Sequence, residues 1–105
     1  MERRNEGTMK PTIKIKEWTF AQSYKNEKVL VGRLAEDHHR SYGEHLIEGH
    51  RVITSAVDKI YKHDTHTIVE TKNTQYYLVG LERPETIEEI NKEKRMNLRR
   101  FENGA

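Results

Sequence analysis

The chain has 105 residues, a formal net charge of +2, no cysteine, and nearly equal shares of charged (34%) and hydrophobic (33%) residues. This length predicts one compact domain, and the lack of cysteine excludes disulfides, thiolate catalysis and cysteine-ligated zinc. The near balance of charge also argues against the strong basic field that is typical of duplex-binding proteins.

Residues 1–10 are expected to form a flexible tail, because charged residues and glycine dominate there. The tail holds no apolar stretch, and no later apolar run is long enough to cross a bilayer. We therefore expect neither a signal peptide nor a membrane anchor, and we expect a cytoplasmic protein.

The first strand is expected over Thr12–Phe20. Ile13 and Ile15 share one face of this strand, but in a regular strand Trp18 would point to the opposite face. This change predicts a bulge near Lys16–Glu17. Polar residues 22–26 then indicate a turn, and Lys28–Leu34 completes a hairpin.

Residues 36–50 have no sustained period of 2 or 3.6 and carry four of the six histidines, so we expect a long surface loop. The histidines raise the question of zinc, which needs three or four ligands in a fixed geometry. The chain offers neither a cysteine nor two histidines at helical i,i+4 spacing. We therefore expect solvated histidines and no metal.

Three further strands are expected to form an antiparallel meander, joined by polar turns. They are Arg51–Tyr61, His66–Thr71 and Thr74–Leu81. Pro84 then opens a helix that is expected to reach Phe101, because acidic residues fill its first turn and basic residues its second half.

These elements predict the α+β class. About five antiparallel strands over residues 11–82 form a small curled sheet or barrel, and one C-terminal helix over residues 83–102 closes it. A hydrophobic share below the roughly 45–50% of ordinary globular chains leaves a thin core. A second copy can complete such a core, so we expect a homo-oligomer.

The sequence lacks the motifs that announce catalysis, including Gly-x-Ser-x-Gly, a Walker loop, a dinucleotide-binding glycine turn and paired carboxylates in an apolar setting. Ser55 lies in the middle of an expected strand, where a hydroxyl more often bonds a neighbouring strand than attacks a substrate. We expect a protein that binds rather than an enzyme, and no cofactor.

Two segments, Val52–Ser55 and Ile68–Leu78, follow a pattern that resembles small β-rich proteins of bacteriophages. Among these it is similar to the anti-Thoeris sponges, which sequester immune messengers of the cyclic ADP-ribose type. The resemblance covers residues 29–81. It implies a viral protein of the host cytoplasm that evades host defence as an oligomer with a β-sheet core, and it places a ligand-binding asparagine at Asn73. The single helix and the histidine-rich loop differ from those sponges.

Sequestering a nucleotide-type messenger requires cations for phosphate, amides or hydroxyls for ribose and an aromatic face for the base. The candidates for these roles are Arg33, Arg51, Thr71, Asn73 and Tyr76.

Two alternatives stay open. One is a protein-binding inhibitor or adaptor that acts on a host enzyme through the exposed loop or a sheet edge. The other is a small single-stranded nucleic-acid-binding protein. For the latter, Tyr76 and Tyr77 point to opposite sides of their strand, so that only one of them can join a stacking platform.

Overall fold

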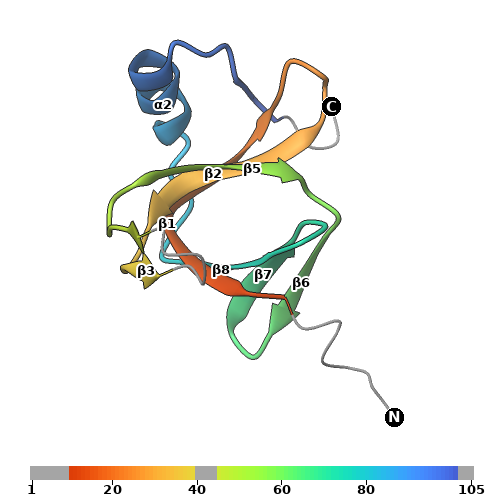
Figure 1. Ribbon diagram of the computed structural model, residues 1–105. Helices are drawn as coiled ribbons and strands as arrows, with labels where there is room; N and C mark the ends of the chain where they lie inside the picture. The colour runs from red at the N-terminus through yellow and green to blue at the C-terminus, as the bar shows by residue number, and fades with distance from the viewer. Residues whose placement is uncertain (1–9, 40–44, 102–105) are drawn as a thin grey trace.

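A computed structural model describes residues 10–39 and 45–101 of the chain (Figure 1). Its main sheet has seven strands, in the order β5-β2-β1-β8-β7-β6 with β9 added beside β1. These elements are β1 (Thr12–Gln22), β2 (Lys28–Leu34), β5 (Arg51–Ala56), β6 (Lys59–His63), β7 (His66–Glu70), β8 (Gln75–Val79), the helix α2 (Thr86–Lys94) and β9 (Arg99–Arg100). The predicted α+β class is confirmed, but the sheet has more than the five strands expected.

Two further short strands, β3 (His38–His39) and β4 (His45–Leu46), pair with each other within the histidine-rich segment. Residues 40–44 of the predicted loop, and residues 1–9 of the predicted tail, lie outside the described residues.

The predicted bulge in β1 is confirmed. The pairing of β1 with β2 shifts register between Lys16 and Thr19, and Glu17 has a positive φ of 50°. Gly32 of β2 lies against this bend, where an added Cβ would come within 2.5 Å of Ile15 Cγ2 and 2.9 Å of the Lys16 carbonyl oxygen. Only glycine therefore allows β2 to approach the bent strand this closely.

The expectation of a purely antiparallel sheet is wrong at one pairing. β1 runs parallel to β8, with Ile13 opposite Tyr76 and Ile15 opposite Leu78. The strands β6, β7 and β8 form the predicted antiparallel meander. Pairing of segments about 60 residues apart depends on how the whole chain folds back, which local patterns do not reveal.

The expected continuous strand over Arg51–Tyr61 is also corrected, because it divides into β5 and β6. At the division Val57 donates its backbone N–H to the Lys28 carbonyl (2.8 Å), and Asp58 donates to the Glu70 carbonyl (2.7 Å). Two adjacent residues thus bond β2 in one half of the sheet and β7 in the other, which explains why the sheet curls. No ladder among the described residues joins β5 to β6, so the sheet is not a closed barrel.

The core has two layers. Inside the curl, residues of β1, β2, β7 and β8 pack together: Ile13, Ile15, Leu30, Leu34, Val69, Tyr76 and Leu78. On the outer face of β5, β2 and β1, a second cluster lies under α2: Ala21, Val29, Val31, Ile87, Ile90 and Leu98. Both layers depend on β2, whose successive side chains enter them alternately.

The helix is shorter than the expected Pro84–Phe101. It ends at Lys94, and the next residue, Arg95, has a left-handed φ of 55°. The chain then turns back, and the Asn91 side chain accepts a hydrogen bond from the Leu98 N–H (2.9 Å) and donates one to the Leu98 carbonyl (2.8 Å). Leu98 is buried as a result, and the following residues form β9.

Helix α2 therefore covers only one half of the curled sheet. In Figure 1 it lies on one side of the molecule, and the meander β6–β7–β8 lies on the other. The outward face of this meander carries the exposed residues Tyr61, His63 and His66.

Candidate functional site

The two arginines predicted to bind a ligand lie opposite each other on β2 and β5. Arg33 forms ion pairs with three carboxylates, those of Glu17 (3.6 Å), Glu89 (3.3 Å) and Glu93 (3.3 Å). Arg51 pairs with Glu93 at 3.2 Å. Both guanidinium groups thus link the sheet to α2, while the buried Nε of Arg51 has no hydrogen-bond partner within the described residues.

The other predicted residues lie elsewhere. Thr71 is buried in the turn after β7, where its hydroxyl donates to the Thr74 carbonyl (3.3 Å), and Asn73 is exposed in the same turn. Tyr76 belongs to the inner core and is 9% exposed. Tyr76 and Arg51 both line a small cleft of about 230 Å³ at one end of the curl. The structure therefore divides the five predicted residues instead of gathering them in one site.

The outward face of the meander is built by strand alternation. Because Tyr76 points into the core, Tyr77 points outward. Tyr77 lies opposite Ile68 on β7, and Ile68 lies opposite Tyr61 on β6. On its other side Tyr77 lies opposite Lys14 of β1. Lys14, Tyr77, Ile68 and Tyr61 thus form one row across four neighbouring strands.

A hollow of about 270 Å³ lies along this row; we call it the tyrosine hollow. It is lined by Thr12, Tyr61, His63, Ile68, Gln75 and Tyr77. The two tyrosines are separated by two strand spacings, about 10 Å, and Ile68 between them is buried and forms the floor. Gln75 lies on one side of the row, two residues before Tyr77 on β8. His63 lies on the other side of the row, two residues after Tyr61 on β6.

The Tyr61 wall is held in place by hydrogen bonds. The Tyr61 hydroxyl donates to Glu70 Oε2 (2.9 Å), and Lys10 Nζ donates to Glu70 Oε1 (3.1 Å). The hydrogen bond from Tyr61, and then that from Lys10, lowers the pKa of Glu70 below its ordinary value. The same bond to the Glu70 carboxylate raises the pKa of Tyr61. Near neutral pH Tyr61 is therefore a neutral donor and Glu70 an anion.

The Tyr77 wall is extended by an aromatic neighbour. The ring of His66 stacks on that of Tyr77 with centroids 4.5 Å apart and an interplanar angle of 27°. His66 lies opposite His63, across the turn that joins β6 to β7. His66 thus covers one face of the Tyr77 ring and holds that ring in place.

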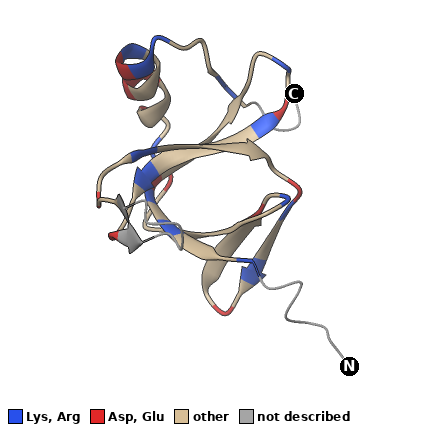
Figure 2. Cartoon of the chain, viewed as in Figure 1, with Lys and Arg blue, Asp and Glu red and all other residues tan. Residues whose placement is uncertain are grey.

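Two lysines lie beside the residues that line the hollow. Lys14 lies beside Tyr77, and Lys59 lies opposite Glu70 on the same face of the sheet as Tyr61. Figure 2 shows basic residues on β6 and near the start of β1. Lys14 has Glu36 as a counter-charge at 3.8 Å, but both side chains are about half exposed, so this pair is weak. The hollow therefore combines aromatic walls with cations that an anionic ligand can recruit.

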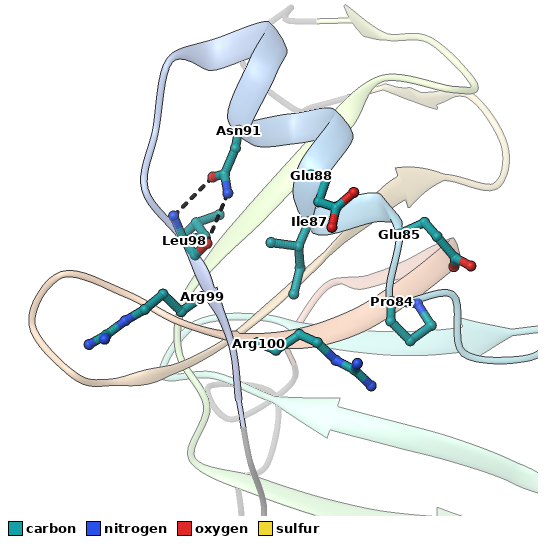
Figure 3. A pocket seen from close by; sticks show the side chains of 8 residues that line it. All are labelled: Pro84, Glu85, Ile87, Glu88, Asn91, Leu98, Arg99 and Arg100. Carbon is teal, nitrogen blue, oxygen red and sulfur yellow. Dashed lines mark hydrogen bonds between the residues drawn. The ribbon is translucent and has the colours of Figure 1, made fainter.

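A larger cleft, of about 480 Å³, separates α2 from β9 (Figure 3). Glu85 and Glu88 lie on its helix side, while Arg99 and Arg100 point to opposite sides of β9. Charges of both signs line the cleft, and the acidic residues stabilise the positive end of the helix. The cleft is the larger of the two, but it has no aromatic side chain among the described residues of its lining, whereas the tyrosine hollow has two tyrosines and a histidine.

Sequence reasoning missed Tyr61, His66 and Gln75. It placed Tyr76 and Tyr77 on opposite faces of their strand and named Tyr76 as the ligand residue, whereas the structure buries Tyr76 and lines the hollow with Tyr77. The signal for Tyr61 was available, because Tyr61 and Ile68 are placed opposite each other by the tight turn at residues 64–65. Which of the two faces would be outward could not be read from the meander alone.

Of the part of the chain that the structure describes, no three His, Asp or Glu side chains form a group suited to a metal ion, and no helix is long and apolar enough to cross a membrane. In comparisons with known protein families, curated proteins and solved structures, nothing matches this chain.

Proposed function

We propose that the protein binds a nucleotide-type ligand without converting it, and that the base of the ligand enters the tyrosine hollow. One observation carries the proposal: Tyr61 and Tyr77 flank an outward-facing hollow that has an apolar floor, and a lysine lies near each tyrosine on the same face of the sheet. Stacking of a base on an aromatic ring contributes about 1–3 kcal/mol and tolerates any base.

The polar groups of the hollow suit the rest of a nucleotide. The Gln75 amide offers both a donor and an acceptor for the edge of a base, and Lys14 and Lys59 offer ammonium groups for phosphate. That the ligand is bound and not converted rests on the sequence, which lacks every catalytic motif considered above. Sequestration of an immune messenger, as the resemblance to phage sponges implies, is one use of such binding.

The proposal is tested by adding AMP, UMP and cyclic ADP-ribose to the purified protein and following its thermal unfolding. A ligand bound only by the folded state raises Tm by mass action. Heating the complex and analysing the released material by mass spectrometry should recover the ligand unchanged. Recovery of a converted product would show an enzyme, and no Tm shift with any nucleotide or oligonucleotide would refute the proposal.

A matched pair of variants locates the site. Tyr77→Ala removes one wall of the hollow and should abolish the Tm shift. Tyr24→Ala also removes a tyrosine ring, but Tyr24 is 86% exposed in the turn between β1 and β2, away from the hollow. It should leave the Tm shift unchanged.

A further inference from the structure

Resting on the proposed function, we infer that the ligand is a segment of single-stranded nucleic acid that crosses the meander from β1 to β6, and not a free nucleotide. The row Lys14–Tyr77–Ile68–Tyr61 gives this path, with Lys59 beside its far end.

The shape of the hollow favours a polymer. A site that retains a small free ligand usually buries 70–90% of that ligand's surface. The tyrosine hollow lies on the outward face of a sheet, and its wall residue Tyr61 is 37% exposed. A free nucleotide would keep much of its surface in water, whereas neighbouring nucleotides of a strand can occupy the sheet on either side of the hollow.

The lysines are spaced in a way that suits the phosphates of a nucleic-acid chain. Lys14 precedes Tyr77 along the row, Lys59 lies two residues before Tyr61 on β6, and Lys16 lies farther along β1 beyond Lys14. Each is on the outward face. Lys59 on β6 lies three strands away from the two lysines of β1, so a single phosphate cannot reach all of them. Successive phosphates of a chain can.

The carboxylates near this path leave the lysines available. Glu70 faces the path but accepts hydrogen bonds from Tyr61 and Lys10. Glu36 and Glu48 pair with Lys14 and Lys16 through side chains that are 61% and 49% exposed. Exposed pairs of this kind contribute little, so phosphates can replace these carboxylates, and the binding should be sensitive to salt.

The nucleic acid must be single-stranded, because stacking on a tyrosine requires an unpaired base. A duplex hides its base faces and would be bound through charge alone, for which a net charge of +2 is small. The two tyrosines give two aromatic rings along one path, and His66 stacks on one face of the Tyr77 ring.

The test measures binding of fluorescein-labelled eight-nucleotide oligo(U) and oligo(dT) by anisotropy at several salt concentrations, with unlabelled UMP and an eight-base-pair duplex as competitors. We expect the oligonucleotides to bind at least tenfold more tightly than UMP and the duplex to compete poorly. Tyr61→Ala and Tyr77→Ala should each weaken oligonucleotide binding about tenfold or more, and Tyr77→Phe should restore most of it. Lys14→Gln and Lys59→Gln should each reduce the slope of log K against log salt by about 0.7.

Tyr24→Ala and Lys92→Gln, which change exposed residues of the β1–β2 turn and of α2, serve as controls and should bind as the unmodified chain does. If UMP binds as tightly as the oligonucleotides, the inference is wrong while the proposed nucleotide site stands. If duplex competes as well as single strand, the inference is wrong as well. If neither nucleotide nor oligonucleotide binds, both proposals are wrong.

Discussion

The ring of His66 stacks on the ring of Tyr77, with centroids 4.5 Å apart, while Tyr76, the residue immediately before Tyr77, is buried in the inner core. One position along a strand thus separates a packing role from a surface role, because successive side chains point to opposite faces. The two tyrosines should differ accordingly when each is truncated.

Tyr76→Ala should lower the free energy of unfolding by about 3–5 kcal/mol, the usual cost of removing a buried aromatic side chain. Tyr77→Ala should cost only about 1–2 kcal/mol, because it loses the stacking with His66 at a partly exposed position. Urea unfolding followed by circular dichroism measures both. Equal losses would contradict the assignment of the two faces.

Gly32→Ala should destabilise the protein by about 1–3 kcal/mol, because the new Cβ would meet Ile15 Cγ2 at 2.5 Å and the Lys16 carbonyl at 2.9 Å. Backbone at the bulge of β1 would have to move. Ser55→Ala, at an exposed position of β5, is the control and should change stability by less than about 0.5 kcal/mol. A stability of Gly32→Ala equal to that of the control would show that β1 and β2 are not so close.

Asn91→Ala should lower stability by about 1–3 kcal/mol. The amide of Asn91 satisfies both backbone groups of the buried Leu98, and their loss leaves polar groups without partners. Asn97→Ala removes an exposed amide six residues later and should have little effect. Faster hydrogen exchange of the Leu98 amide in Asn91→Ala alone would identify this contact as the cause.

The bond between Tyr61 and Glu70 should give stability a dependence on pH at both extremes. Because the pKa of Glu70 is lowered by folding, its contribution is present above its unfolded pKa of about 4.3 and is lost as pH falls through the lower folded value. Because the pKa of Tyr61 is raised, its contribution is present below about pH 10 and is lost as pH rises through the higher folded value.

Tyr61→Phe removes this bond and should cost about 0.5–1.5 kcal/mol at pH 7. The difference from the unmodified chain should shrink at pH 3. In an NMR titration the pKa of Glu70 should rise in this variant, yet stay below its ordinary value because Lys10 still donates to it. An unchanged Glu70 titration would show that the bond does not form in solution.

Arg33→Gln should lower stability by about 1–2 kcal/mol, a cost between those of exposed and buried ion pairs, because three carboxylates lose their common partner. It should leave nucleotide binding within about twofold of the unmodified chain. A loss of binding without a loss of stability would instead show that Arg33 belongs to the ligand site, as the sequence predicted.

The sequence by itself determined the local elements. The parity change between Ile15 and Trp18 predicted the bulge at Glu17, and the strand Lys28–Leu34 has the bounds that the structure gives. The meander and the existence of one C-terminal helix were equally predictable. These features depend on residues close together in the chain, whose alternation and turn propensity act before any distant contact forms.

Only the tertiary structure decided the pairings and the site. The parallel pair of β1 and β8, the division of residues 51–61 between two sheet edges, and the return of the chain after Arg95 all depend on contacts between distant segments. The same holds for the candidate site. Because α2 packs on β5, β2 and β1, the outward face of β6–β7–β8 carries Tyr61 and Tyr77 to solvent, while Arg33 and Arg51 are drawn into ion pairs with the helix.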